Sequence, residues 1–218
     1  MLVRDLQCLL ATLYGVDIGP DVRDYLVTDA VALGVTQAVR QVRKPAEQLL
    51  IEQGDGEIGL ALYLEQAVLD HLAADDPRCT LDGRNLADFC LAVEGVSHFN
   101  YVAWNAARDT AVTLLELEMQ AEVDKYACAR VLLGAQPRPA QTRVLEALFD
   151  EPVFDPALDA VERERYVEAS RLASGYCRRL QRRFPAGAPA AALVRELRSF
   201  FRWSQPAKVS HIRTALLS

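Results

Sequence analysis

The segment LLELEMQAEVDKY, residues 114–126, places four carboxylates in a stretch that otherwise has the apolar spacing of a buried helix. Glu118 and Glu122 are one helical turn apart, so their side chains share a face. Carboxylates on an apolar face need partners or raised pKa values, because burial and mutual repulsion both disfavour double ionisation. This pair is therefore the first candidate for metal ligation or acid/base chemistry.

A second pair, Glu94 and His98, lies four residues apart in VEGVSHFNY. These two share a face only if the helix continues through Gly95. Should they approach Glu118 and Glu122, three carboxylates and an imidazole would form a ligand set suited to manganese, iron or zinc. The sequence lacks the Glu-x-x-His spacing by which di-iron helical bundles present their ligands. A carboxylate/His-ligated metal enzyme is therefore an alternative rather than the main prediction.

The favoured interpretation of the same carboxylates is structural, since buried charges are usually paired. In it, Glu118 and Glu122 accept hydrogen bonds from buried hydroxyls, from backbone amides or from an arginine of a neighbouring helix, such as Arg108 or Arg130. The remaining polar side chains of this helix gather on a different side, which we expect to face solvent: Thr113, Glu116, Gln120 and Asp124.

A second group of candidates is basic. The predicted helix over 157–184 has an arginine face that would suit phosphates or an acidic partner, formed by Arg171, Arg178, Arg179, Arg182 and Arg183. A solvated face, or one that docks on the acidic part of the chain, is the simpler interpretation. Nucleic-acid binding is the less favoured alternative, because no known binding motif accompanies the charge.

The elements that must position these residues are mostly helices. Apolar periodicity predicts helices over 2–14, 21–42, 65–73, 85–94, 111–133, 157–184, 189–203 and 206–217. Two short apolar segments around Gly54-Asp55-Gly56 predict a β-hairpin near 48–64. Residues 99–104 either pair with it as a third strand or continue the preceding helix. The fold class is thus mainly α and bundle-like with a small β-hairpin, or α+β if a third strand pairs.

Charge is unevenly divided along the 218 residues. Residues 1–137 hold 10 basic and 21 acidic side chains, whereas residues 138–218 hold 14 and 9. We predict an acidic N-terminal helical domain over 1–136, a proline-containing connection over 137–158 and a basic C-terminal helical subdomain over 159–218. The subdomain either packs on the first domain or offers a separate partner surface.

Composition and motifs favour a cytoplasmic protein. Hydrophobic residues make up 51% of the chain and charged residues 25%, an ordinary globular balance. The five scattered cysteines indicate buried thiols in a reducing compartment, and neither a secretory signal nor a membrane span is expected. No phosphate-binding loop or serine-nucleophile motif is present. The main prediction is a soluble binding or regulatory protein without catalytic activity or cofactor, which acts through protein–protein interaction or self-association.

Overall fold

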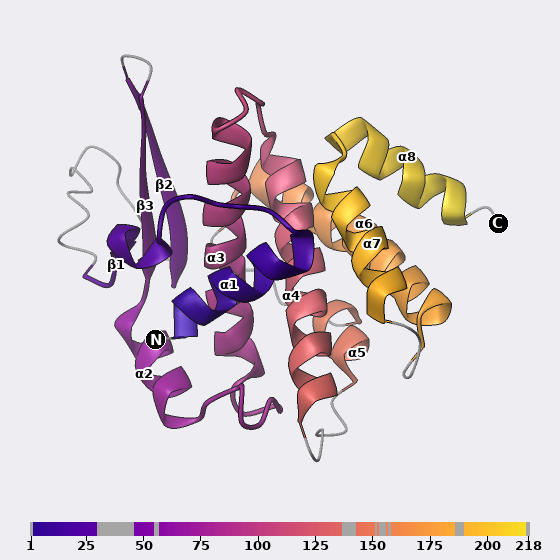
Figure 1. The fold of residues 1–218 in the computed structure, drawn as a ribbon, viewed down its shortest axis with the longest axis horizontal. Coiled ribbons are helices and arrows are strands. Elements are labelled where there is room, and N and C mark those ends of the chain that lie inside the picture. The colour runs from indigo at the N-terminus through magenta and orange to yellow at the C-terminus, as the bar shows by residue number, and fades with distance from the viewer. Residues whose placement is uncertain are drawn as a thin grey trace.

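Two long helices that lie side by side form the centre of the fold (Figure 1). They are α3 (Leu86–Ala106) and α4 (Leu114–Ala135). The computed structural model describes residues 2–29, 46–54, 57–136, 143–150, 152, 156, 158–185 and 190–216. Helices dominate these residues and a small sheet accompanies them, which confirms the predicted fold class.

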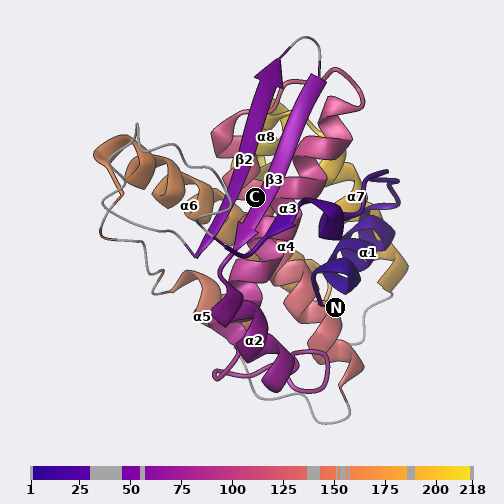
Figure 2. The same cartoon turned by 90° about the vertical axis from the view of Figure 1, so that its left-hand side faces the viewer.

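A three-stranded sheet covers one side of α3 (Figure 2). Strands β2 (Glu47–Gly54) and β3 (Glu57–Leu64) form the predicted antiparallel hairpin, with Leu49 opposite Leu62. The third strand is β1 (Leu26–Val27), which pairs parallel to β3 at its outer edge. A third strand therefore exists, but it is not the segment 99–104.

Residues 99–104 belong to α3, which runs without a break through Gly95. The predicted end of this helix near residue 94 was wrong. A glycine costs a helix only about 1 kcal/mol relative to alanine, and the surroundings of α3 outweigh that cost. The helix lies between the sheet and α4, and it is buried from Val96 to Asn105. Burial on all sides explains why its sequence lacks a clear polar face.

The other helices surround this centre. In Figure 1, α1 crosses in front of α3 and α4, and the C-terminal helices lie on the far side of α4 from the hairpin. Helix α6 packs on α4, α7 on α1 and α8 on α6. The helices are α1 (Leu2–Tyr14), α2 (Gln66–Ala74), α5 (Val144–Phe149), α6 (Ala160–Arg183), α7 (Ala190–Arg202) and α8 (Gln205–Leu216). Within the described residues, no helix combines the length and the apolar character needed to cross a membrane.

Two further elements differ from the predictions. The helix expected over 21–42 begins as a 3₁₀ turn, Val22–Tyr25, and continues as β1; residues 30–45 lie outside the described part of the chain. Helix α6 begins at Ala160, because Asp159 and Glu162 form a reciprocal capping box.

Arginines of α7 hold the C-terminal end of α1. Arg198 donates to the main-chain carbonyls of Leu13 and Thr12, each at 3.0 Å. Arg202 donates to the carbonyls of Tyr14 and Gly15 at 2.9 and 3.1 Å. The last carbonyls of a helix have no partner within the helix, and they carry the negative end of its dipole. The two arginines therefore satisfy these groups and attach the basic C-terminal part of the chain to α1.

Candidate metal centre

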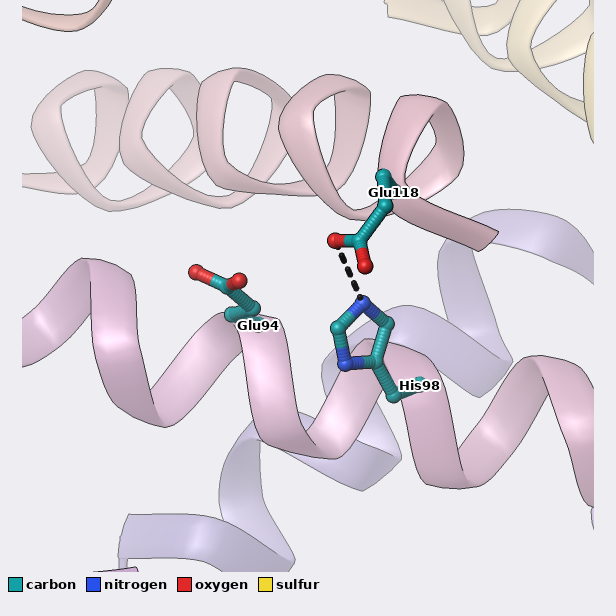
Figure 3. Close-up of side chains that lie close together, drawn as sticks. All are labelled: Glu94, His98 and Glu118. Atoms are coloured by element: carbon teal, nitrogen blue, oxygen red, sulfur yellow. Dashed lines mark ion pairs between the residues drawn. The ribbon is translucent and has the colours of Figure 1, made fainter. Parts of the chain in front are cut away.

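Three of the four predicted metal-ligand candidates meet in the structure. Glu94 and His98 lie on one face of α3, and Glu118 points at them from α4 (Figure 3). One ligand atom from each lies within 4.8 Å of the other two. Donor atoms bound to one cation at about 2.1 Å are roughly 3 to 4 Å apart. Small side-chain adjustments would therefore let these three atoms bind one ion.

His98 is held between two carboxylates. Its Nδ1 lies 3.3 Å from Glu47 Oε1, and its Nε2 lies 3.5 Å from Glu118 Oε2. The second distance is long for a hydrogen bond, and Nε2 is a buried atom without a hydrogen-bond partner. Only 6% of the His98 side chain is exposed. An imidazole nitrogen is thus directed at a carboxylate in a buried setting without forming a hydrogen bond.

Lys125 neutralises the other side of the cluster. Its Nζ lies 2.7 Å from Glu94 Oε2 and 2.8 Å from Glu122 Oε1. Burial disfavours the ammonium, yet the two carboxylates raise the pKa of Lys125 well above its ordinary value. The same contact, against the effect of burial, keeps the pKa of Glu94 below its ordinary value. Glu122 is therefore an ion-pair partner of Lys125 rather than a member of the group around His98.

Among the residues that the structure describes, the cluster contains more negative than positive groups. Four carboxylates, Glu47, Glu94, Glu118 and Glu122, contact two groups that can carry positive charge, Lys125 and His98. Burial and the neighbouring Glu94 and Glu118 raise the pKa of Glu47, even though His98 opposes this. Burial leaves the imidazole less basic, but Glu47 and Glu118 more than offset this and raise the pKa of His98. Taking up a proton is one response to buried negative charge, and binding a divalent cation is another.

Two residues that the sequence analysis missed complete the surroundings. Glu47 begins β2, and it comes close to α3 because Gly95 has no side chain: a Cβ there would lie 2.8 Å from Leu62 Cδ1 and 3.1 Å from Glu47 Cγ. Tyr166 of α6 is the second. Burial, followed by the charges of Glu118, Glu94 and Glu47, raises the pKa of its phenol. Neither residue has a spacing in the sequence that links it to the α3 and α4 ligands.

The side of α4 that was expected to face solvent is buried instead. Glu116, Gln120 and Asp124 are only 6%, 0% and 1% exposed, whereas Thr113 is exposed and caps the helix. That prediction failed because α1 and α8 cover this side, which cannot be foreseen from α4 alone. The helix therefore presents polar groups to two different buried surroundings.

Lys208 of α8 is fully buried within this second cluster. It donates to Tyr101 Oη at 2.8 Å and to Gln120 Oε1 at 3.0 Å, and it lies 3.4 Å from Glu116 Oε1. Burial lowers the pKa of Lys208 to about 8, although Glu116 acts in the opposite direction. Lys208 of α8 thus joins side chains of α3 and α4 in one buried polar layer.

Asp124 receives hydrogen bonds from several directions. Ser97 Oγ donates at 2.6 Å and Gln120 Nε2 at 2.9 Å, and the Tyr14 hydroxyl also donates to this carboxylate. Even so, burial raises the pKa of Asp124 to about 6. The Tyr14–Asp124–Lys208 layer is therefore a satisfied structural network rather than a site with donor atoms aimed at a ligand.

The arginines proposed as hydrogen-bond partners of the carboxylates lie elsewhere. Arg108 stacks 4.2 Å over the ring of Trp104 and donates to the Trp104 carbonyl. Arg130 donates to Tyr126 Oη and to the carbonyl of Phe184. The carboxylates are paired, as the structural interpretation requires, but with His98 and Lys125.

Most of the arginine face of α6 is engaged in contacts within the chain. Arg171 pairs with Glu168, Arg178 with Asp150 and Arg183 with Glu196, while Arg179 contacts His211 Nε2 at 2.7 Å. Arg182 is exposed and lines a shallow groove with Arg178, Glu146 and Gln181. The face is thus less positive than its sequence suggests, and phosphate binding there stays a prediction.

Comparisons with known proteins give no independent indication of function. No family model matches the sequence, and neither the curated proteins nor the solved structures contain a match.

Proposed function

We propose that this protein is a metal-dependent enzyme in which Glu94, His98 and Glu118 hold one divalent cation. The observation that supports the proposal is the meeting of these three ligand atoms within 4.8 Å at a place where, in the described part of the chain, carboxylates outnumber cationic groups. Glu47 is close enough to His98 to serve as a further ligand or as its hydrogen-bond acceptor.

The ligand types favour particular ions. Carboxylate oxygens suit manganese, and an imidazole added to them suits iron or zinc as well. A cation with three protein ligands keeps coordination positions for water and substrate, where it can act as a Lewis acid and lower the pKa of water. Around it, the chain would supply Glu47 as a base and the phenol of Tyr166, which burial keeps protonated, as a hydrogen-bond donor.

The test is metal content after dialysis against Mn²⁺, Fe²⁺ or Zn²⁺. We expect about one ion per chain in the wild type and a loss of at least tenfold in affinity for Glu118→Gln and for His98→Gln. Glu122→Gln is the matched control, because it removes a carboxylate from the same helix one turn away and should retain the ion. Circular dichroism confirms that each variant is folded. The proposal would be refuted if the wild type bound no stoichiometric ion, or if both ligand variants bound the ion as tightly as the wild type.

The other functions expected from the sequence stay predictions. A protein-interaction role without catalysis and a cytoplasmic location are compatible with the described residues, as is nucleic-acid binding through α6. No contact in the structure favours any of them specifically.

A further inference from the structure

Lys125 occupies a place between two carboxylates that resembles the place of a metal ion. Its Nζ lies at 2.7 and 2.8 Å from oxygens of Glu94 and Glu122, and only 10% of its side chain is exposed. Glu94 and Glu122 come from different helices, α3 and α4, so the contact depends on the packing of the fold. The ammonium is thus a cation held in a built pocket, rather than a surface charge.

Glu94 connects this place to the proposed metal centre. Its Oε2 contacts Lys125, and its carboxylate also offers an oxygen to the group with His98 and Glu118. Figure 3 shows the Glu94 carboxylate directed toward α4 beside the His98–Glu118 pair. In two-metal sites, ions lie about 3.5–4 Å apart and share such ligands. His98 Nε2, buried and without a hydrogen-bond partner, is an independent sign that the cluster is arranged for a ligand.

We propose that Glu94 and Glu122 form a second cation subsite, which the ammonium group of Lys125 fills, so that Lys125 limits the centre to one divalent ion. This inference rests on the proposed function, because it assumes that Glu94, His98 and Glu118 hold the first ion. It adds that Lys125 sets the number of ions.

The electrostatic consequence of removing the ammonium supports a direct test. A neutral side chain at position 125 would leave Glu94 and Glu122 as buried carboxylates without their counter-charge, which is strongly unfavourable. A divalent cation can supply that charge and bind the same oxygens. Methionine has nearly the length and flexibility of lysine, so Lys125→Met changes the charge with little change in volume.

The experiment counts bound Mn²⁺ by equilibrium dialysis and atomic absorption in four proteins. We expect one ion per chain in the wild type, two in Lys125→Met, one in Lys125→Arg, which keeps the positive charge, and one in Lys125→Met/Glu122→Gln, which lacks the second subsite. Electron paramagnetic resonance should show magnetic coupling between neighbouring ions in Lys125→Met alone. This spectrum separates a second ion at the centre from one bound elsewhere.

The result that overturns the inference is the same Mn²⁺ count in Lys125→Met as in the wild type. If the wild type binds no ion, the proposed function fails and the inference fails with it, whereas one ion in both the wild type and Lys125→Met overturns the inference alone. Lys125→Met should depend on Mn²⁺ for stability, so it is refolded with the ion present, and Lys125→Gln provides a second neutral variant. Failure of both to fold in Mn²⁺ also overturns the inference, because the ion should replace the missing counter-charge.

Discussion

At Gly95, α3 passes so close to the sheet that a side chain would collide with it. The position needs a small residue for reasons of contact, since its backbone is ordinary helix. Leu62, the nearest side chain, is fully buried and cannot turn away into solvent. The close approach brings the start of β2, and with it Glu47, to His98. One missing methyl group therefore helps to build the candidate centre.

We predict that Gly95→Ala destabilises the protein although alanine is the better helix former. Overpacking in a filled core costs about 1–3 kcal/mol, against a gain of about 1 kcal/mol in helix propensity. Urea unfolding followed by circular dichroism measures the difference. Gly134→Ala is the control, because a Cβ there meets nothing within 4 Å and should stabilise α4 slightly. Equal stability gains in both variants would contradict the close approach.

On the scale of single elements, α4 has an unusual distribution of polar groups. Glu118 pairs with His98 of α3 and Glu122 with Lys125, whereas Glu116, Gln120 and Asp124 contact residues of α1, α3 and α8. Both groups are largely buried, so the helix lacks the single polar face of a surface helix. The candidate metal centre and the Tyr14–Asp124–Lys208 layer thus lie on two different sides of α4.

The burial of Asp124 predicts a specific dependence of stability on pH. Between its ordinary pKa of 3.8 and its folded value of about 6, the folded protein holds a proton on Asp124 that the unfolded chain has released. Its contribution to the free energy of unfolding therefore falls as pH rises through this window. The two pKa values differ by an amount worth roughly 3 kcal/mol.

Asp124→Asn lacks this titration. Relative to the wild type, its free energy of unfolding should rise between pH 4 and pH 7 by up to the same roughly 3 kcal/mol. Urea unfolding at intervals across this range measures the change. Asp109→Asn, at an exposed turn, is the control for removing a carboxylate outside this buried network. A constant difference for Asp124→Asn would mean that Asp124 is ionised normally in the folded protein.

The elements that could be predicted from sequence are those whose apolar spacing and turn residues lie within the element itself. Helix α1 and the β2–β3 hairpin have clear periodicity, and both were predicted correctly. The continuation of α3 through Gly95 and the burial of Asp124 were not, because each depends on an element distant in the sequence. For the candidate site, the ligands on α3 and α4 could be proposed from their one-turn spacing. Glu47 and Tyr166 could not, since only packing brings them near the ligands of α3 and α4.

On the scale of the whole molecule, the uneven charge of the chain corresponds to how its ends meet. Basic side chains of the C-terminal part contact the N-terminal part through Arg198, Arg202 and Lys208. Their partners are helix-end carbonyls in two cases and a buried carboxylate in the third. Part of the charge asymmetry thus serves contacts within the chain, and this part is not available to a partner.

We predict that Lys208→Met lowers the free energy of unfolding, because Glu116 then stays buried without a positively charged partner. Removing one member of a buried pair typically costs roughly 3–5 kcal/mol. The double variant Lys208→Met/Glu116→Gln should recover part of this loss, since it removes both charges. Arg213→Met on the exposed side of α8 is the control. Thermal unfolding measures all three, and an unchanged midpoint for Lys208→Met would contradict the role of Lys208.

Because the same turns of α4 supply side chains to two buried clusters, the number of residues in these turns is fixed. An inserted or deleted residue near position 119 would rotate everything after it by about 100° relative to what precedes it. Glu118 would then keep its place beside His98 only if Glu122, Asp124 and Lys125 left theirs. Related chains can therefore change the loops at either end of α4 in length, but the central turns of this helix should tolerate substitution only.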